Sequence, residues 1–121
     1  MTEITLAKKA GFCFGVDRAV NLVYELLEKG EKVCTLGPII HNPQLVWELG
    51  NKGVRIVETP SEVNCGETLV IRSHGVAKSV ITEAEQLGIK IADATCPFVA
   101  KIHKIVNEKS REGFVTIIAG D

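Results

Sequence analysis

Two cysteines and two histidines occupy positions in this sequence that favour ligand chemistry over packing. Cys13 lies between two aromatic residues and two glycines, in the stretch AGFCFGVD, directly before a helical pattern. Cys96 opens a second helical pattern in the same way. His41 precedes an Asn-Pro pair, and His74 precedes a glycine that lets a backbone approach a ligand. Thiolates at helix N-termini suit metal ligation, and imidazoles beside helix N-termini suit a phosphate or diphosphate group.

Three kinds of chemistry fit two thiols and two imidazoles gathered in one place. A Cys2His2 zinc site agrees with the count, but the long spacings lack the short Cys-x-x-Cys knuckle of structural zinc sites. The same absence weakens a thioredoxin-type dithiol. An iron–sulfur cluster prefers thiolates, and one cysteine per repeat would leave an iron open for substrate. The alternatives without any ligand role are core cysteines and ordinary loop histidines, although Gly11, Gly15 and Pro97 indicate exposed turns around the thiols.

Short β-branched runs alternate with amphipathic segments along the chain, which is typical of an α/β fold with a parallel sheet flanked by helices. The predicted strands are Ile4–Ala7, Val33–Leu36, Val54–Val57, Leu69–Arg72, Ile89–Ala92 and Phe114–Ile118. The predicted helices run from Val16 to before Gly30, from Pro43 to before Gly53, from Lys78 to Leu87 and from Pro97 to before Gly113. The segment Thr59–Glu67 is expected to be a loop or a single turn.

Ligands of open parallel sheets bind beyond the carboxyl ends of the strands. Cys13, His41, His74 and Cys96 each follow a predicted strand and would therefore gather at that edge. Cys34 lies inside a predicted strand, where a small buried hydrophobe is the better interpretation. Cys65 falls in the uncertain loop and does not share the position.

A repeat with a period of 83 residues relates the start of the chain to its end. The same offset separates Cys13 from Cys96, Gly30 from Gly113 and Gly37 from Gly120. Any two strand–helix units share a periodic helix and a closing glycine, but three offsets without a gap exceed that requirement. We therefore expect one α/β domain over residues 1–96 and the beginning of a second, truncated repeat over 97–121, in a fragment of a longer protein. The repeat also predicts a histidine four residues beyond Gly120.

Composition narrows the class of protein. The 121 residues carry 45% hydrophobic and 24% charged residues, and the net charge is −1, which excludes the basic footprint of a nucleic-acid binder. The N-terminus is charged at once, unlike a signal peptide, and no apolar run approaches the roughly 20 residues that span a bilayer. We expect a cytoplasmic protein without a membrane partner, in which the four cysteines are thiols, ligands or catalysts rather than disulfides.

Four segments together resemble the LytB family, the 4-hydroxy-3-methylbut-2-enyl diphosphate reductases of the non-mevalonate isoprenoid pathway. They occur in order and cover the chain from end to end, which is far more specific than one short motif. The segments are AGFCFGVDRA around Cys13, GPIIHNP around His41, RSHG around His74 and DATCPFV around Cys96.

The resemblance implies a trefoil of three similar α/β domains around a central [4Fe–4S] cluster, held by one cysteine from each domain. Cys13 and Cys96 match the first two ligand positions, and His41 and His74 match histidines that hold the substrate diphosphate. The implied reaction removes the allylic hydroxyl, which binds the unligated iron, and gives isopentenyl and dimethylallyl diphosphate. An external donor such as ferredoxin or flavodoxin would supply the electrons.

The sequence departs from the family pattern by stopping early. The third cysteine is absent, since Cys34 and Cys65 match no ligand position, and the third diphosphate histidine and the acidic proton-relay residue are expected just after Asp121. We therefore expect this chain alone to fold without a complete cluster, to be inactive and to self-associate through an uncovered apolar patch. The alternatives are a non-catalytic diphosphate-binding module and a zinc-binding structural unit. The family pattern and the repeat both predict that Cys13 and Cys96 lie within about 10 Å of each other, as ligands of one cluster must.

Overall fold

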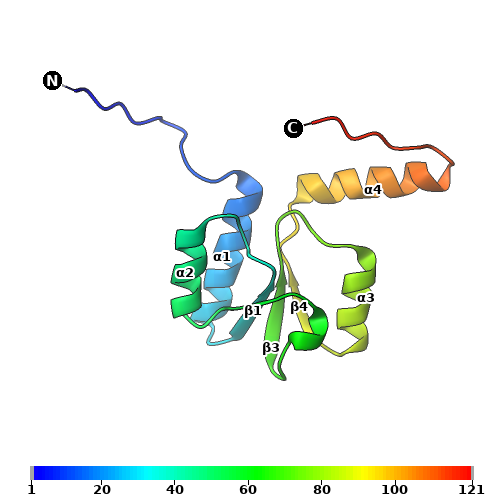
Figure 1. Ribbon diagram of the computed structural model, residues 1–121, viewed down its shortest axis with the longest axis horizontal. Helices are drawn as coiled ribbons and strands as arrows, with labels where there is room; N and C mark the ends of the chain where they lie inside the picture. The colour runs from blue at the N-terminus through cyan, green and yellow to red at the C-terminus, as the bar shows by residue number, and fades with distance from the viewer. Residues whose placement is uncertain (1, 121) are drawn as a thin grey trace.

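A computed structural model describes residues 2–120, so that Met1 and Asp121, the outer limits of the two predicted domains, lie outside the described part. The predicted α/β class is confirmed. Four parallel strands form one sheet in the order β2-β1-β3-β4, and helical segments connect consecutive strands along the chain (Figure 1). In chain order the elements are α1 (Phe14–Glu28), β1 (Lys32–Leu36), α2 (Pro43–Asn51), β2 (Arg55–Val57), the 3-10 turn η1 (Pro60–Glu62), β3 (Glu67–Ile71), α3 (Lys78–Gln86), β4 (Lys90–Asp93) and α4 (Pro97–Arg111).

The two central strands form the core of the molecule. Strands β1 and β3 are continuous runs of buried residues after their first position, as a parallel sheet covered on both faces requires. Helices α1 and α2 pack on one face of the sheet, around Val33 and Val70. Helix α3 packs on the other face, around Cys34 and Leu69. The alternation of residues along each strand thus divides the core into two layers.

Four of the six predicted strands are confirmed to within two residues, and the other two are wrong. Ile4–Ala7 and Phe114–Ile118 form no strand in the described range, although both are rich in β-branched residues. Their large side chains are exposed, with Ile4 at 83% and Val115 at 89%. A strand needs a hydrogen-bonded neighbour, and neither segment pairs with the sheet that the described residues form.

The predicted helices are confirmed, and so is the expected single turn at Thr59–Glu67, which is η1. Helix α2 begins as the Asn-Pro pair predicts, because the side chain of Asn42 accepts a hydrogen bond from the amide of Leu45 at 3.1 Å and Pro43 occupies the first turn. None of the helices in the described part is long and apolar enough to cross a bilayer.

Helix α4 differs from the others in its surroundings. It extends away from the body of the sheet in Figure 1, on the side of the sheet where α1 also begins. The structure describes every residue of α4, and none of them is buried. This end of the sheet, where the strands finish, therefore carries the elements that the sequence analysis marked for chemistry.

Candidate active site

All four predicted site residues lie at the carboxyl end of the sheet. Cys13 is the N-cap of α1, and Cys96 is the N-cap of α4. His41 follows β1, directly before the N-cap of α2, and His74 follows β3. Because β1 and β3 are neighbours in the sheet, the two histidine loops are neighbours as well.

The N-terminus of α1 packs directly against Cys96. A Cβ built on Gly15 would lie 2.8 Å from both Cβ and Sγ of Cys96, so no larger residue fits there without a shift. Gly15 is buried by this contact, and the interpretation of Gly15 as an exposed turn is wrong. The rings of Phe14 and Phe98 add an edge-to-face contact with centroids 6.0 Å apart. Cys13 is two residues from Gly15, a span of at most about 7 Å, and its approach to Cys96 within about 10 Å stays a prediction.

The two thiols are not engaged in capping their own helices. Neither Cys13 nor Cys96 makes a side-chain cap hydrogen bond in the described residues, although both occupy N-cap positions. Cys13 is exposed, whereas Cys96 is buried with 8% of its surface accessible. Both sulfur atoms therefore lie at the positive end of a helix without a capping hydrogen bond, and that of Cys13 is also exposed.

The other two cysteines have different surroundings. Cys34 is fully buried in β1, which confirms the prediction from its place in a strand. Burial raises the pKa of its thiol to about 11, so it stays protonated and inert. Cys65 is exposed in the turn before β3, at the opposite end of that strand from His74. Neither cysteine belongs to the candidate site.

His74 lies in a four-residue turn that the amide of Gly75 closes by donating to the carbonyl of Arg72 at 3.0 Å. Although the residue is exposed overall, partial burial of its ring lowers its pKa below the ordinary value, and the charges of Arg72 and His41 lower it further. An anion placed between the two imidazoles would oppose this shift, because negative charge favours the imidazolium.

Hydrogen bonds connect the thiol end to the histidine turn. The amide of Cys96 donates to the carbonyl of Ser73 at 2.7 Å, and the amide of Ala94 donates to the carbonyl of Ile71 at 2.9 Å. The segment before α4 therefore continues alongside the turn that carries His74. One end of the sheet holds both groups of predicted site residues in a fixed order.

Three further residues support this end of the sheet, and the sequence analysis gave them no role. The guanidinium of Arg18 donates to the Thr95 carbonyl at 3.1 Å and ties α1 to the segment before α4. The ring of His103 lies against Gly75, with Cε1 3.0 Å from the position of a Cβ built there. Thr95 and His103 together leave no space for a side chain at Gly75. Arg18 lies in the segment AGFCFGVDRA and Thr95 in DATCPFV, but their contacts are visible only in the structure.

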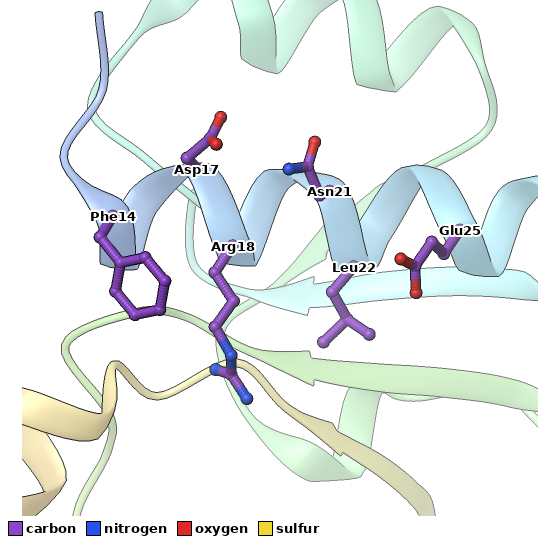
Figure 2. Close-up of a pocket in the computed structure, with 6 residues that line it drawn as sticks. All are labelled: Phe14, Asp17, Arg18, Asn21, Leu22 and Glu25. Carbon is purple, nitrogen blue, oxygen red and sulfur yellow. The ribbon is translucent and has the colours of Figure 1, made fainter.

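A hollow of about 450 Å³ runs along the exposed side of α1. It is lined by Phe14, Asp17, Arg18, Asn21, Leu22 and Glu25. Figure 2 shows the Arg18 side chain pointing from α1 toward the segment that leads from β4 into α4, where its hydrogen bond with Thr95 is made. The predicted histidines and cysteines lie outside this lining, so the hollow borders the candidate site without containing it.

Metal ligation by this chain alone is limited by the number of ligands. Among residues 2–120, no three His, Cys, Asp or Glu side chains converge on a point that could hold an ion. A four-ligand zinc site of the Cys2His2 type requires such a convergence, so the described geometry gives it no support. Cys13 and Cys96, at adjoining helix N-termini, are two thiols without a third His, Cys, Asp or Glu side chain converging with them in the described residues.

Comparisons with known proteins agree along nearly the whole chain. The family model described as LytB protein matches residues 4–121. The 4-hydroxy-3-methylbut-2-enyl diphosphate reductase of Geobacter sp. (strain M21) is 48% identical over 119 residues, which are 98% of this chain and 42% of that relative. The relative of the same name from Caldanaerobacter subterraneus subsp. tengcongensis is 47% identical over 123 residues and is covered to 43%. The chain thus spans less than half the length of the curated relatives it matches.

Solved structures agree with this result. A structure of (E)-4-hydroxy-3-methyl-but-2-enyl diphosphate reductase, the terminal enzyme of the non-mevalonate pathway, has a TM-score of 0.79 and 45% identity. The match covers 100% of this chain and 43% of the chain in that structure. The structure of the corresponding reductase from Plasmodium falciparum has a TM-score of 0.82 and 30% identity, over 88% of this chain and 34% of that one.

Proposed function

Since the chain belongs to the LytB protein family, we propose that it contributes two cluster thiolates and two diphosphate-binding histidines to a 4-hydroxy-3-methylbut-2-enyl diphosphate reductase. One observation carries the proposal. Cys96 packs against Gly15, beside Cys13, while its backbone amide donates to Ser73, beside His74. Thiols and histidines thereby share one end of the sheet, where the redox group and the anion of a single substrate have to meet.

Cys13 and Cys96 would hold a [4Fe–4S] cluster, with the third thiolate coming from the rest of the full-length protein. Their chemistry fits the group, because both sulfur atoms are free of capping hydrogen bonds in the described residues and both lie at positive helix ends. When bound, the cluster supplies the two electrons of the reaction, which an external donor such as ferredoxin or flavodoxin delivers.

His41 and His74 would bind the diphosphate of the substrate by donating ring N–H groups to its oxygens. The allylic C–O bond breaks, two electrons and two protons are consumed, and water leaves, which gives isopentenyl or dimethylallyl diphosphate. The acid that delivers the proton is expected beyond Asp121. In this proposal the two histidines of this chain bind and position the substrate.

The domain limits predicted from the repeat also belong to this proposal. Residues 1–96 would form the first α/β domain of a trefoil, and α4 with the segment after it would begin the second. The uncovered apolar side chains of α4 support this division, because a partner sheet would bury them. Alone, this chain would self-associate through the same surface. The complete protein would work in the cytoplasm, where its soluble electron donors are found.

The thiolate assignment can be tested on the anaerobically purified full-length protein. Cys13→Ser and Cys96→Ser should each lose iron, sulfide and visible absorption, while Cys65→Ser, which changes an exposed thiol away from the site, should keep all three. Full cluster content and activity in Cys13→Ser would refute the assignment. A colourless protein containing zinc would instead support the zinc-binding unit, and a metal-free protein that binds diphosphate would support the binding module.

The histidine assignment has a separate readout. His41→Ala and His74→Ala should keep the cluster and raise KM by about tenfold each, because each removes one hydrogen bond to an anion. Loss of the cluster in these variants, with no change in KM for the remaining active fraction, would place the histidines outside the substrate site.

A further inference from the structure

Arg72 lies between the two histidine loops and contacts both. It follows β3 and opens the turn that carries His74, so its own backbone belongs to one loop. Its guanidinium reaches the other loop, since Nη1 lies 2.7 Å from the position of a Cβ built on Gly37. Gly37 follows β1 with a φ of +70°, and His41 lies four residues further on. The guanidinium thus fills the space that the absent side chain of Gly37 leaves.

The charge of Arg72 is not neutralised within the described chain. The side chain is half-buried, its Nε is inaccessible to solvent, and no hydrogen-bond partner for that atom is found among residues 2–120. None of the ion pairs in the same range involves Arg72. A guanidinium stays protonated at every relevant pH, so a half-buried one without a carboxylate is a costly arrangement. An anion bound at this place would remove that cost.

We propose that Arg72 is a third group of the diphosphate site beside His41 and His74, which attracts the anion by its permanent charge and holds the two histidine loops at a fixed separation. This inference rests on the proposed function. Burial of the His74 ring lowers its pKa and so disfavours the charged imidazole, whereas the guanidinium of Arg72 keeps its charge. Arg72 therefore supplies a permanent positive charge that attracts the anion.

The shape of the side chain explains why arginine suits this place better than lysine. The flat guanidinium can lie against the Gly37 backbone and still direct further N–H groups elsewhere, whereas an ammonium is a compact, strongly hydrated point charge. Lysine at this position would keep the charge and lose the contact with Gly37. The two contributions, charge and position, can therefore be separated by substitution.

The test measures binding of inorganic pyrophosphate to the full-length protein by titration calorimetry at low and moderate salt. Arg72→Met should weaken binding about tenfold and flatten its salt dependence, because one fixed charge is lost. Arg72→Lys should keep the salt dependence of the unchanged protein while binding several-fold more weakly. Equal affinity and equal salt dependence in Arg72→Met would overturn the proposal.

A second pair of variants keeps the test decisive if Arg72→Met fails to fold. Gly37→Ala leaves Arg72 in the sequence but places a methyl group 2.7 Å from its Nη1, so the guanidinium must move. Gly30→Ala is the matched control, since Gly30 has a similar φ of +76° and, in the described structure, nothing within 4 Å of a built Cβ. Weaker pyrophosphate binding in Gly37→Ala than in Gly30→Ala is the expected result, and equal binding contradicts it.

The histidine variants distinguish failure of this inference from failure of the proposed function. If His41→Ala and His74→Ala weaken pyrophosphate binding while Arg72→Met does not, only the role of Arg72 is wrong. If neither histidine variant changes the affinity, the diphosphate site itself is wrong.

Discussion

Helices α1 and α4 occupy equivalent positions of the 83-residue repeat, but only α1 has buried residues. Both contain 15 residues and follow a cysteine N-cap, and their first and last residues differ by the same 83 positions. The same offset relates the hydrogen bonds at their ends and the glycines with positive φ that close them, Gly30 and Gly113. The repeat predicted from three residue pairs thus extends to both ends of each helix.

The two helices differ in the burial of their apolar side chains. Along α1 the buried apolar residues after the first turn are Ala19, Val20, Val23 and Leu26. The equivalent positions of α4 are Ile102, His103, Val106 and Lys109, and no residue of this fully described helix is buried. The apolar residues of α4 that are exposed include Phe98, Ile102 and Ile105.

The difference in burial separates what the local sequence determines from what packing against the sheet determines. Local sequence determines where a helix begins and ends, because cap, apolar spacing and closing glycine are repeated and the limits are repeated with them. The sheet decides whether the apolar side becomes core. Helix α1 leads into β1, which pairs with β2 and β3, whereas α4 leads into residues 114–118, which pair with no strand in the described range.

A matched pair of valines should give the largest effect. Val23 is fully buried in α1, and Val106, at the equivalent position of α4, is half-buried. Val23→Ala should lower the free energy of unfolding of the 121-residue chain by about 2 kcal/mol, through lost transfer energy and a cavity. Val106→Ala should change it by less than about 0.5 kcal/mol. Urea denaturation followed by circular dichroism measures both, and equal losses would show that α4 is packed as α1 is.

Acid should affect the sheet far more than α4. The carboxylate of Glu67, at the start of β3, accepts two hydrogen bonds of 2.9 Å from Arg55, which lower its pKa to about 2. A lowered folded-state pKa contributes stability above the ordinary value of 4.5, and that stability is lost as the pH falls from 4.5 toward 2. Since Arg55 is partly exposed, we expect about 1–2 kcal/mol from this pair.

Replacing one carboxylate at a time compares the Arg55–Glu67 pair of the sheet with an exposed ion pair of α4. Glu67→Gln should lose about 1–2 kcal/mol at pH 7 and make unfolding less dependent on pH below 4.5. Glu112→Gln removes the exposed pair with Lys109 at the end of α4 and should cost less than about 0.5 kcal/mol. A pH profile of Glu67→Gln identical to that of the unchanged chain would show that another group governs acid unfolding.

The sequence was sufficient for the features that depend on local pattern. It predicted the four strands that form, the four helices and a loop or single turn within Thr59–Glu67, because caps, glycines and hydrophobic periodicity act within a few residues. It also predicted Cys34 as core and the gathering of Cys13, Cys96 and the histidine loops at one end of the sheet. Parallel topology brings the ends of neighbouring strands together. Cys13 lies at this end as the N-cap of α1, although the strand predicted before it does not form in the described range.

Features that depend on contacts between distant residues could not be predicted. Ile4–Ala7 and Phe114–Ile118 have the composition of strands, yet strand formation depends on a partner that local composition does not specify. The role of Gly15 was missed because a glycine in a helical turn looks the same whether it faces solvent or a thiol 81 residues away. Arg72 and His103 were missed for the same reason, since their neighbours Gly37 and Gly75 come from other parts of the chain.

The smallest expected effect concerns the one place where α1 and α4 touch through a glycine. Gly15→Ala and Gly50→Ala are a matched pair within helices, because in the described structure a Cβ built on Gly50 has nothing within 4 Å, whereas one on Gly15 would lie 2.8 Å from the Cys96 sulfur. Alanine favours a helix by up to about 1 kcal/mol, so Gly50→Ala should be stabilising.

At Gly15 the collision outweighs that gain, and we expect a net loss of about 1 kcal/mol. The more specific sign is chemical. In a background without Cys13 and Cys65, the remaining thiols are those of Cys96 and Cys34, both buried. Displacement of Cys96 by the new methyl group should make it react faster with a thiol reagent, whereas Cys34 stays protected. If Gly15→Ala were as stabilising as Gly50→Ala and left the reaction rate unchanged, the N-terminus of α1 would not be the surface that holds Cys96 in place, and the structural basis for placing both thiols at one cluster would be lost.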